Sequence, residues 1–352
     1  MADSQGGSAN GPKVIVAVID TGIDYNHPDL KDQMWTNPGE TPGDGVDNDG
    51  NGIVDDYYGA NFVTDEGTRG DPMDSNGHGT HCAGIIAATA NNGAGIAGIA
   101  GSSQGKVKLM AVKGLGQNGG ALSWLVGGLN YAISKGAKLS SNSWGGVSSG
   151  GVSEFTTVLS NHAEHLFVSA AGNSNTEVQA NFVPCAVDTS NQLCVGSTTS
   201  SDARSSFSNY DSKYVHVFAP GSSIRSTYPN NQYRYLSGTS MACPQVSGLA
   251  ALVMSMRDNL TPAQIKTLIE ATVQKKNQYS GLASSGGLID VDATISALMT
   301  GTIPTTQSTT PATTTTLNGC GSPQWATDKY CDDENNNAGC NWDGGACCNN
   351  DQ

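Results

Sequence analysis

The sequence predicts an α/β fold: a three-layer αβα arrangement around a doubly wound parallel sheet, with a small disulfide-rich module at the C-terminal end. Three observations support this prediction. The run Val14–Ile19 is apolar throughout, as in a strand buried on both faces of a parallel sheet. Strand-like and helix-like segments then alternate along the chain, which is typical of a doubly wound sheet. Five of the nine cysteines fall within Cys320–Cys348, which indicates a disulfide module.

Length and charge limit the classes of function. The chain has 352 residues and a net charge of −14, from 17 basic and 31 acidic residues. This balance argues against a nucleic-acid partner. No apolar run approaches the roughly 18–20 residues of a spanning helix, so we expect no membrane span. A hydrophobic content of 37% with 45 glycines suits a loop-rich globular enzyme.

The first strand ends in an acid, and a later loop brings a histidine to the start of a helix. Asp20 follows Val14–Ile19 directly. It therefore lies at the carboxyl end of a strand, where open α/β sheets place their sites. His78 stands in Asn76–His81, just before the apolar, helix-like run Cys82–Ala88. Either residue alone has an ordinary structural interpretation, as a capping acid or a hydrogen-bonded loop histidine.

A serine opens an apolar-rich run of helical length. Small residues lead into Ser240, and the apolar-rich run Met241–Met256 follows. The first turn of such a helix has free N–H groups and positive dipole character, which suit an oxyanion. Pro244 is compatible with that first turn. Ser240 alone is as well explained as a helix cap. Together, however, an acid, a base and a hydroxyl occur in the order Asp, His, Ser, which is the order of subtilisin.

Four blocks of the sequence resemble the signature blocks of the subtilisin-like serine peptidases, the subtilases. They are Asp20–Gly22, Asn76–His81, Phe167–Asn173 and Gly238–Pro244, and the resemblance spans residues 13–298. It implies a subtilisin-like fold over residues 1–300. It also implies that Ser240 is the nucleophile, His78 its general base and Asp20 the group that orients His78. Asn173 would then donate to the oxyanion beside the Ser240 N–H.

The same resemblance implies a binding cleft for an extended polypeptide. Its two backbone edges would be Gly114, Leu115 and Gly116 on one side and Ser143, Trp144, Gly145 and Gly146 on the other. Ala170, Ala171 and Gly172 would form a wall of the primary specificity pocket. The alternative is that these are ordinary glycine-rich strand ends. Helices are expected near residues 122–134 and 152–163, and after Thr261-Pro262, where threonine suits the cap and proline the first helical position.

Calcium is the expected cofactor, in a structural role, and no catalytic metal is expected. By resemblance, Asp29 and Asn92 match two calcium ligands. The acidic insertion, residues 37–61, places Asp47, Asp49 and Asn51 at the spacing that opens an EF-hand loop, with Asp55 close behind. The twelfth position is Tyr58 rather than glutamate, so the loop is not a complete EF-hand. The alternative is a solvated acidic loop.

The remaining cysteines support an extracellular protein. Cys185 and Cys194 flank a short polar loop and are expected to form a disulfide, with two buried thiols as the alternative. Cys82 and Cys243 are interpreted as small buried residues. Residues 1–8 carry no basic start or apolar core, so no signal peptide is visible. We expect a secreted enzyme whose signal and propeptide are not part of this chain, and a cytosolic enzyme is the alternative.

The C-terminal part is expected to be a linker and a second module. Residues 301–318 form a Thr/Pro-rich linker. Residues 319–352 resemble a Notch-type calcium-binding cysteine repeat, in which Asp332, Asp333 and Asp343 are candidate ligands. Ala346 replaces the acid usual near its end, so a metal-free, disulfide-stapled module is the alternative. Five cysteines cannot all pair with one another, so we expect the repeat to be incomplete in this sequence. This module could bind a protein partner.

The sequence therefore predicts a serine endopeptidase that hydrolyses polypeptides through an acyl-enzyme intermediate. Two alternatives come from other classes. One is a catalytically silent, calcium-dependent binding protein. The other is a metallohydrolase that uses His78, His81 and an acid, although this spacing lacks the His-Glu-x-x-His pattern.

Overall fold

The structure, a computed structural model, describes residues 14–301. The expected linker, apart from Gly301, lies outside the described residues. So does the expected cysteine module with Asp332, Asp333 and Asp343.

A mixed sheet, almost wholly parallel, forms the middle layer of residues 14–301. Its strand order is β12-β13-β9-β8-β6-β4-β1-β3-β2, and β12 pairs antiparallel with β13 while the other pairs are parallel. The apolar first strand, β1 (Val14–Asp20), lies inside the sheet, between β3 (Val107–Lys113) and β4 (Leu139–Asn142). The other strands are β2 (Gly59–Asn61), β6 (Leu166–Ala170), β8 (Gln192–Thr198), β9 (Val217–Pro220), β12 (Gln274–Lys275) and β13 (Gly287–Leu288).

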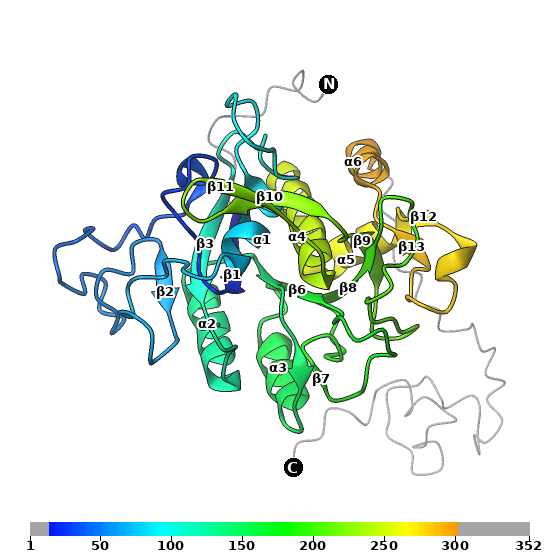
Figure 1. The fold of residues 1–352 in the computed structure, drawn as a ribbon, viewed down its shortest axis with the longest axis horizontal. Coiled ribbons are helices and arrows are strands. Elements are labelled where there is room, and N and C mark those ends of the chain that lie inside the picture. The colour runs from blue at the N-terminus through cyan, green and yellow to red at the C-terminus, as the bar shows by residue number, and fades with distance from the viewer. Residues whose placement is uncertain (1–13, 302–352) are drawn as a thin grey trace, which may run out of the picture. The chain divides into compact units, whose positions relative to one another are not determined.

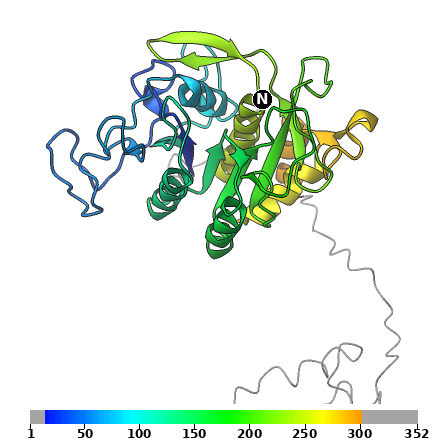
Figure 2. The same ribbon diagram turned by 60° about the horizontal axis from the view of Figure 1, so that its bottom comes forward.

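Helices cover both faces of this sheet (Figures 1 and 2). Val16 and Val18 of β1 belong to one apolar cluster, together with residues of the helices on that face. Ala17 and Ile19 point the other way and belong to a second cluster. Because side chains alternate along a strand, a strand with helices on both faces must be apolar at every position. The helices of the first face are α1 (His78–Ala87), α4 (Thr239–Met256), α5 (Pro262–Ala271) and α6 (Val291–Thr300), and those of the second are α2 (Leu122–Ser134) and α3 (Gly151–Asn161).

The helix ends follow their local sequence. Thr261 caps α5, its hydroxyl accepting from Gln264 N while the Gln264 side chain accepts from Thr261 N, and Pro262 takes the first helical position. Helix α3 ends two residues before the expected residue 163. Helix α4 begins at Thr239, so Pro244 lies inside the helix rather than in its first turn as we expected.

Smaller elements complete the described part. Hairpin β10 (Ile224–Tyr228) and β11 (Gln232–Leu236) is antiparallel, as is the pair β5 (Gly146–Val147) and β7 (Phe182–Val183). Two 3₁₀ turns, η1 (Lys31–Gln33) and η2 (Asn277–Tyr279), lie in connections. Cys185 and Cys194 form a disulfide, and Cys82 and Cys243 are buried free thiols. Among the helices of residues 14–301, none has both the length and the apolar character needed to cross a bilayer.

Candidate active site

The site lies where the strand order reverses. From β1 the chain proceeds to β2 and β3 on one side of the sheet, whereas from β4 it proceeds to β6 on the other side. β1 and β4 are neighbours, and open α/β sheets bind ligands at the carboxyl ends of strands where the order reverses. Asp20 ends β1 and Ser143 directly follows β4, so both residues lie at these carboxyl ends.

Asp20 holds the imidazole of His78. Nδ1 of His78 lies 2.8 Å from Oδ1 of Asp20, across 58 residues of sequence. Asp20 is fully buried, whereas the side chain of His78 is 28% exposed. Burial disfavours the imidazolium, but the adjacent Asp20 carboxylate outweighs burial and raises the pKa of His78 well above its usual value. Because Nδ1–H donates to Asp20, Nε2 is left as the proton acceptor.

A second buried acid, Asp74, fixes this pair in place. Asp74 accepts hydrogen bonds from the Thr21 hydroxyl at 3.0 Å, Gly77 N at 2.8 Å and Thr80 N at 2.9 Å. The Thr21 hydroxyl in turn accepts from Gly79 N at 2.9 Å. These bonds satisfy the free N–H groups at the start of α1 and tie them to the end of β1. We did not predict this role from the sequence, although an acid just before a helix start is a capping signal.

Ser240 lies in the first turn of α4 and is connected to His78 through Cys82. Its hydroxyl donates to the carbonyl of Ser143 at 3.0 Å. Pro244 has no N–H, so the Ser240 carbonyl loses its helical donor. It accepts instead from Ser143 Oγ at 2.9 Å and Cys82 Sγ at 3.4 Å. Cys82 Sγ also lies 4.0 Å from His78 Nδ1, so this buried thiol contacts both the imidazole and the serine residue.

Two hydrogen-bond donors face a common space beside Ser240. Asn173 Oδ1 accepts from Thr239 N at 2.8 Å and Thr239 Oγ1 at 2.9 Å, which leaves the Asn173 Nδ2 donor pointing elsewhere. A methyl group built on Gly238 would lie 3.4 Å from Asn173 Nδ2 and 3.6 Å from Ser240 N. The two N–H donors therefore border the space that glycine leaves open. This is the arrangement expected of an oxyanion hole.

The structure corrects one of the two expected substrate edges. The N–H groups of Gly114 and Leu115 donate to the Asp20 carbonyl, and Gly116 exchanges hydrogen bonds with Gly119 in a tight turn. These three N–H groups are therefore used inside the protein and are not available to pair with a peptide. Gly120, which follows the turn, makes no main-chain hydrogen bond within residues 14–301.

The second expected substrate edge, Ser143–Gly146, and the expected wall of the specificity pocket, Ala170–Gly172, lie side by side. β4 and β6 are parallel neighbours, with Asn142 opposite Ser169. Ser143, Trp144, Gly145 and Gly146 continue from β4, while Ala171 and Gly172 continue from Ala170 at the end of β6. Trp144 is anchored by its indole N–H, which donates to the Ile19 carbonyl at 2.9 Å. Gly172 N donates to Thr239 Oγ1 at 3.0 Å, which connects this wall to α4.

The first expected calcium pair does come together. Asp29 is fully buried, and its Oδ1 accepts from Asn92 Nδ2 at 2.6 Å. Asp29 Oδ2 accepts from Ile96 N at 3.1 Å and the Tyr233 hydroxyl at 2.8 Å. The Asn92 side-chain oxygen accepts from Ala94 N, so it does not face Asp29. In this arrangement the two residues clamp a loop, and Asn92 would have to turn its amide to ligate a cation with Asp29.

The acidic insertion gathers a different set of carboxylates from the one we expected. Asp47 accepts from Gly50 N, Asn51 N and Gly52 N, and Asp55 accepts from Gly43 N and Gly45 N. The Asn51 side-chain oxygen accepts from Ile53 N. These side chains shape the loop by bonding to its own backbone. Of the expected four, only Asp49 joins a carboxylate cluster.

That cluster consists of Glu40, Asp49 and Asp56, whose ligand atoms lie within 4.8 Å of one another. Glu40 is 7% exposed, and its Oε2 is buried with no hydrogen-bond partner in the described structure. Lys135 of the α2 C-terminus forms ion pairs with Asp49 and, at 3.3 Å, with Asp56. Lys135 thus pairs with two of the three carboxylates, and the third, Glu40, keeps a buried oxygen without a partner in the described structure. This donor set fits a hard divalent cation.

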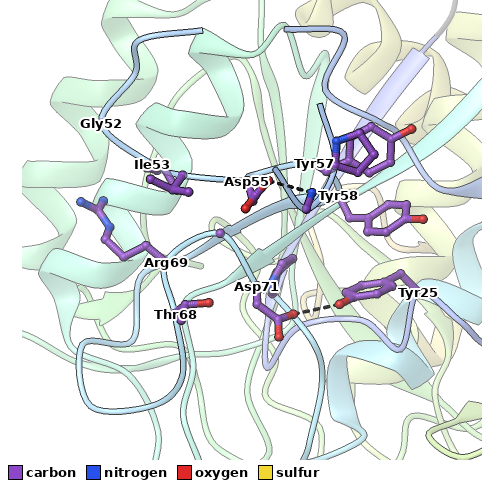
Figure 3. A pocket seen from close by; sticks show the side chains of 14 residues that line it. Tyr25, Gly52, Ile53, Asp55, Tyr57, Tyr58, Thr68, Arg69 and Asp71 are labelled. Atoms are coloured by element: carbon purple, nitrogen blue, oxygen red, sulfur yellow. Dashed lines mark hydrogen bonds between the residues drawn. The ribbon is translucent and has the colours of Figure 1, made fainter. Parts of the chain in front are cut away.

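A cavity of about 540 Å³ lies between the insertion and residues 68–72 (Figure 3). Figure 3 shows the rings of Tyr25, Tyr57 and Tyr58 along one side and Arg69 on the other. The Tyr25 hydroxyl donates to Asp71 at 3.0 Å. None of Asp20, His78 and Ser240 lines this cavity, so it is separate from the candidate triad.

His81 does not join His78. Its Nε2 lies 3.1 Å from the Ile224 carbonyl and 3.0 Å from the Arg234 carbonyl, so it donates to the β10–β11 hairpin. Burial lowers the pKa of His81 to about 4. His81 therefore fastens α1 to the hairpin, and the site that the metallohydrolase alternative requires is not formed by these two histidines.

The sequence profile of the Subtilase family matches residues 11–288, most of the chain. The chain belongs to the subtilase family. This membership agrees with the geometry above, since hydrogen bonds and the Cys82 contacts bring together the subtilase blocks that carry Asp20, His78, Asn173 and Ser240.

Several subtilases are similar to this chain. Subtilisin-like protease 1 of Plasmodium vivax is 37% identical over 302 residues, covering 78% of this chain and 46% of that protein. Thermitase of Thermoactinomyces vulgaris is 39% identical over 270 residues, covering 76% and 83%. The major intracellular serine protease of Bacillus subtilis is 38% identical over 256 residues, covering 70% of each. The chain spans about half the length of the Plasmodium relatives it matches.

Among solved structures, a cold-adapted subtilisin-like serine proteinase matches with a TM-score of 0.59 and 31% identity. The match covers 80% of this chain and 88% of that one. Its subtilisin-like fold agrees with the parallel sheet and the two helical layers of residues 14–301.

Proposed function

We propose that this subtilase is a serine endopeptidase. The observation that carries the proposal is the arrangement around Ser240. The buried Cys82 thiol contacts both the main chain of Ser240 and a histidine that a buried carboxylate holds, and two N–H donors border one small space beside Ser240. A histidine can take the proton of the Ser240 hydroxyl, and the two N–H donors can stabilise the oxyanion that forms when this hydroxyl attacks an acyl group.

The chemistry is derived from these groups. Ser240 Oγ leaves its bond to the Ser143 carbonyl and gives its proton to His78 Nε2 as it attacks the scissile carbonyl. Asp20 stabilises the imidazolium that results. The oxyanion accepts hydrogen bonds from Asn173 Nδ2 and Ser240 N. His78 then protonates the leaving amine, and a water that His78 deprotonates releases the acyl-enzyme.

The substrate is a polypeptide in extended conformation. We assign Gly120 on one side, and residues Ser143–Gly146 on the other, to pair with the main chain of the substrate. Main-chain pairing gives affinity without strong dependence on side chains, and the neighbouring pockets then select the sequence.

An active-site-directed fluorophosphonate tests the proposal, with mass spectrometry to locate the adduct. We expect one adduct per molecule, at Ser240, and cleavage of an unfolded protein substrate by the same sample. Ser240→Ala should abolish both, while Ser237→Ala, a serine just outside the site, should abolish neither. A folded sample that neither reacts nor cleaves would contradict the proposal and would favour the silent binding protein.

We also propose that calcium stabilises this enzyme through Glu40, Asp49 and Asp56. The support is the unpartnered Glu40 Oε2 and the excess of two negative charges over Lys135. The ion would supply the missing partner of Glu40 and draw the insertion toward α2, with Lys135 turning outward. Since binding to the folded state alone adds stability, calcium at 100 times its Kd would add about 2.7 kcal/mol.

Calcium titration followed by thermal unfolding tests this second proposal. We expect a rise in Tm for the wild type that Glu40→Gln largely removes. Asp47→Asn is the matched control, because Asp47 belongs to the same insertion but lies outside the cluster. An equal rise in all three proteins would place the ion elsewhere, with Asp29 and Asn92 as the next candidates.

The disulfide Cys185–Cys194 supports a third proposal, that the protein works in an oxidising compartment such as the extracellular space. The intracellular relative from Bacillus subtilis shows that the fold alone does not decide this. Alkylation of free thiols in protein isolated from its natural source is the test. Modification of Cys185 and Cys194 without prior reduction would contradict an oxidising location.

A further inference from the structure

The ring of Phe182 lies between the two backbone segments that we assigned to the primary specificity pocket. A methyl group built on Gly145 would lie 2.9 Å from both Cε1 and Cζ of Phe182. A methyl group built on Gly172 would lie 2.7 Å from the same Cζ atom. One aromatic ring therefore contacts the backbone of both walls.

Strand pairing and main-chain hydrogen bonds hold the backbone of Phe182 in place. β7 carries Phe182 and pairs with β5, with Val147 opposite Phe182 and Gly146 opposite Val183. Phe182 N donates to the Gln179 carbonyl at 2.8 Å, and the Phe182 carbonyl accepts from Ala186 N at 2.9 Å. The side chain is half-buried and packs against the cluster that includes Ala171 and Cys185. Movement of the ring out of its place would therefore lose apolar contacts.

These distances set the room left for a substrate side chain. Nonbonded carbon atoms approach no closer than about 3.5 Å, so not even one methyl group fits between the ring and either glycine. A side chain that enters between Ser143–Gly146 and Ala170–Gly172 can only occupy the part of the space that the ring does not fill.

We propose that Phe182 is the specificity-determining residue of this site and restricts the substrate residue before the scissile bond to glycine, alanine or serine. This inference rests on the proposed endopeptidase function, because it concerns the same cleft. A larger residue, such as leucine or phenylalanine, would have to displace the Phe182 ring. In a hydrophobic pocket, a difference of one methylene already changes kcat/KM by about 10–200-fold.

Cleavage of a matched peptide series tests the inference. The peptides differ only in the residue before the scissile bond, which is alanine, leucine or phenylalanine. We expect wild-type kcat/KM to be on the order of 100-fold higher for alanine than for phenylalanine. Phe182→Ala should reduce this ratio at least about tenfold, by raising kcat/KM for phenylalanine while leaving that for alanine within a few fold.

Three variants control for effects on folding. Phe182→Tyr keeps the bulk and should keep the preference, and Val147→Ala, on the opposite strand, should also keep it. Phe182→Leu should give an intermediate ratio and carries the test if Phe182→Ala does not fold. Two results would overturn the inference: a wild type that cleaves after phenylalanine as fast as after alanine, or a ratio unchanged in a folded Phe182→Ala or Phe182→Leu.

The labelling of Ser240 separates this inference from the proposed function. A wild type that reacts with the fluorophosphonate and cleaves peptides regardless of residue size would refute only the role of Phe182. A folded wild type that neither reacts nor cleaves would refute the endopeptidase proposal itself.

Discussion

Thr239 makes two hydrogen bonds to one atom of Asn173, from its main-chain N at 2.8 Å and from its hydroxyl at 2.9 Å. The two residues are 66 positions apart, and these bonds orient the side-chain amide of Asn173. Its Nδ2 donor then borders the same space as Ser240 N. The orientation of Asn173 is therefore set by the residue next to the nucleophile, on a different element.

Replacement of Thr239 by valine should lower kcat at least roughly fivefold. Valine keeps the shape but removes one hydrogen bond to Asn173, which is worth about 1 kcal/mol, and also the acceptor of Gly172 N. Asn173→Ala sets the upper limit, since loss of such a donor costs about 10²–10³ in kcat, a magnitude measured in subtilisin itself. Steady-state kinetics are the measurement, and Thr239→Ser is the control that keeps the hydroxyl. If Thr239→Ser were as impaired as Thr239→Val, the hydroxyl would not be the cause.

The pH dependence of kcat/KM should report the Asp20–His78 pair. The base must be neutral, so activity should fall as pH decreases through the raised pKa of His78. Asp20→Asn removes the carboxylate that raises this pKa. The acid limb should then move to lower pH, while the maximal rate falls about 10⁴-fold, as in another triad protease. An acid limb at the same pH in Asp20→Asn would contradict the assignment.

The raised pKa of His78 also affects stability, but in the opposite direction: activity is lost at low pH, whereas the stabilising effect is lost at high pH. A histidine with a higher pKa in the folded protein stabilises the fold where it is charged, so this contribution is fully present below about pH 6.5. It is lost as pH rises through the pKa of folded His78. The difference in unfolding free energy between wild type and Asp20→Asn, measured by chemical denaturation across this range, should therefore shrink as pH rises.

Asp74→Asn should destabilise the protein by about 3 kcal/mol, because a buried carboxylate with several donors loses its charge and leaves donors unpaired. Since Asp74 also ties β1 to α1 through Thr21, the acid limb of the rate profile should shift as well. A Thr21→Val variant and the double variant complete a mutant cycle. Stability changes that simply add would show that the two residues do not act together.

His165 should make the fold sensitive to mild acid. Its ring is buried between the Ala137 carbonyl and the Ser140 hydroxyl, and burial lowers its pKa to about 4. A lowered pKa means that the unfolded chain takes up the proton first, so stability should fall as pH decreases from about 6.5 toward 4. The loss should approach about 3 kcal/mol, as 1.36 kcal/mol accompanies each pKa unit. Chemical denaturation of wild type and His165→Gln at pH 7 and pH 4.5 measures it, and equal losses in both would contradict it.

The sequence by itself determined the elements and the catalytic candidates. Val14–Ile19 had to be a strand covered on both faces, because every position is apolar. Thr261 and Pro262 specified a helix start through local hydrogen bonding and a fixed φ angle. Asp20, His78 and Ser240 could be named because they occur in the order Asp, His, Ser within blocks that resemble those of the subtilases. The strand, the helix start and these blocks are each made by neighbours within a few residues, and such neighbours are visible in the sequence.

Only the tertiary structure decided which side chains meet. It placed Glu40, Asp49 and Asp56 together and left Asp47 and Asp55 bonded to their own loop. It closed Gly114–Gly116 with internal hydrogen bonds and put the ring of Phe182 against Gly145 and Gly172. Contacts of this kind depend on strand register and on the path of each loop, which the packing of the whole domain fixes. Residue type and spacing along the chain therefore do not reveal these contacts.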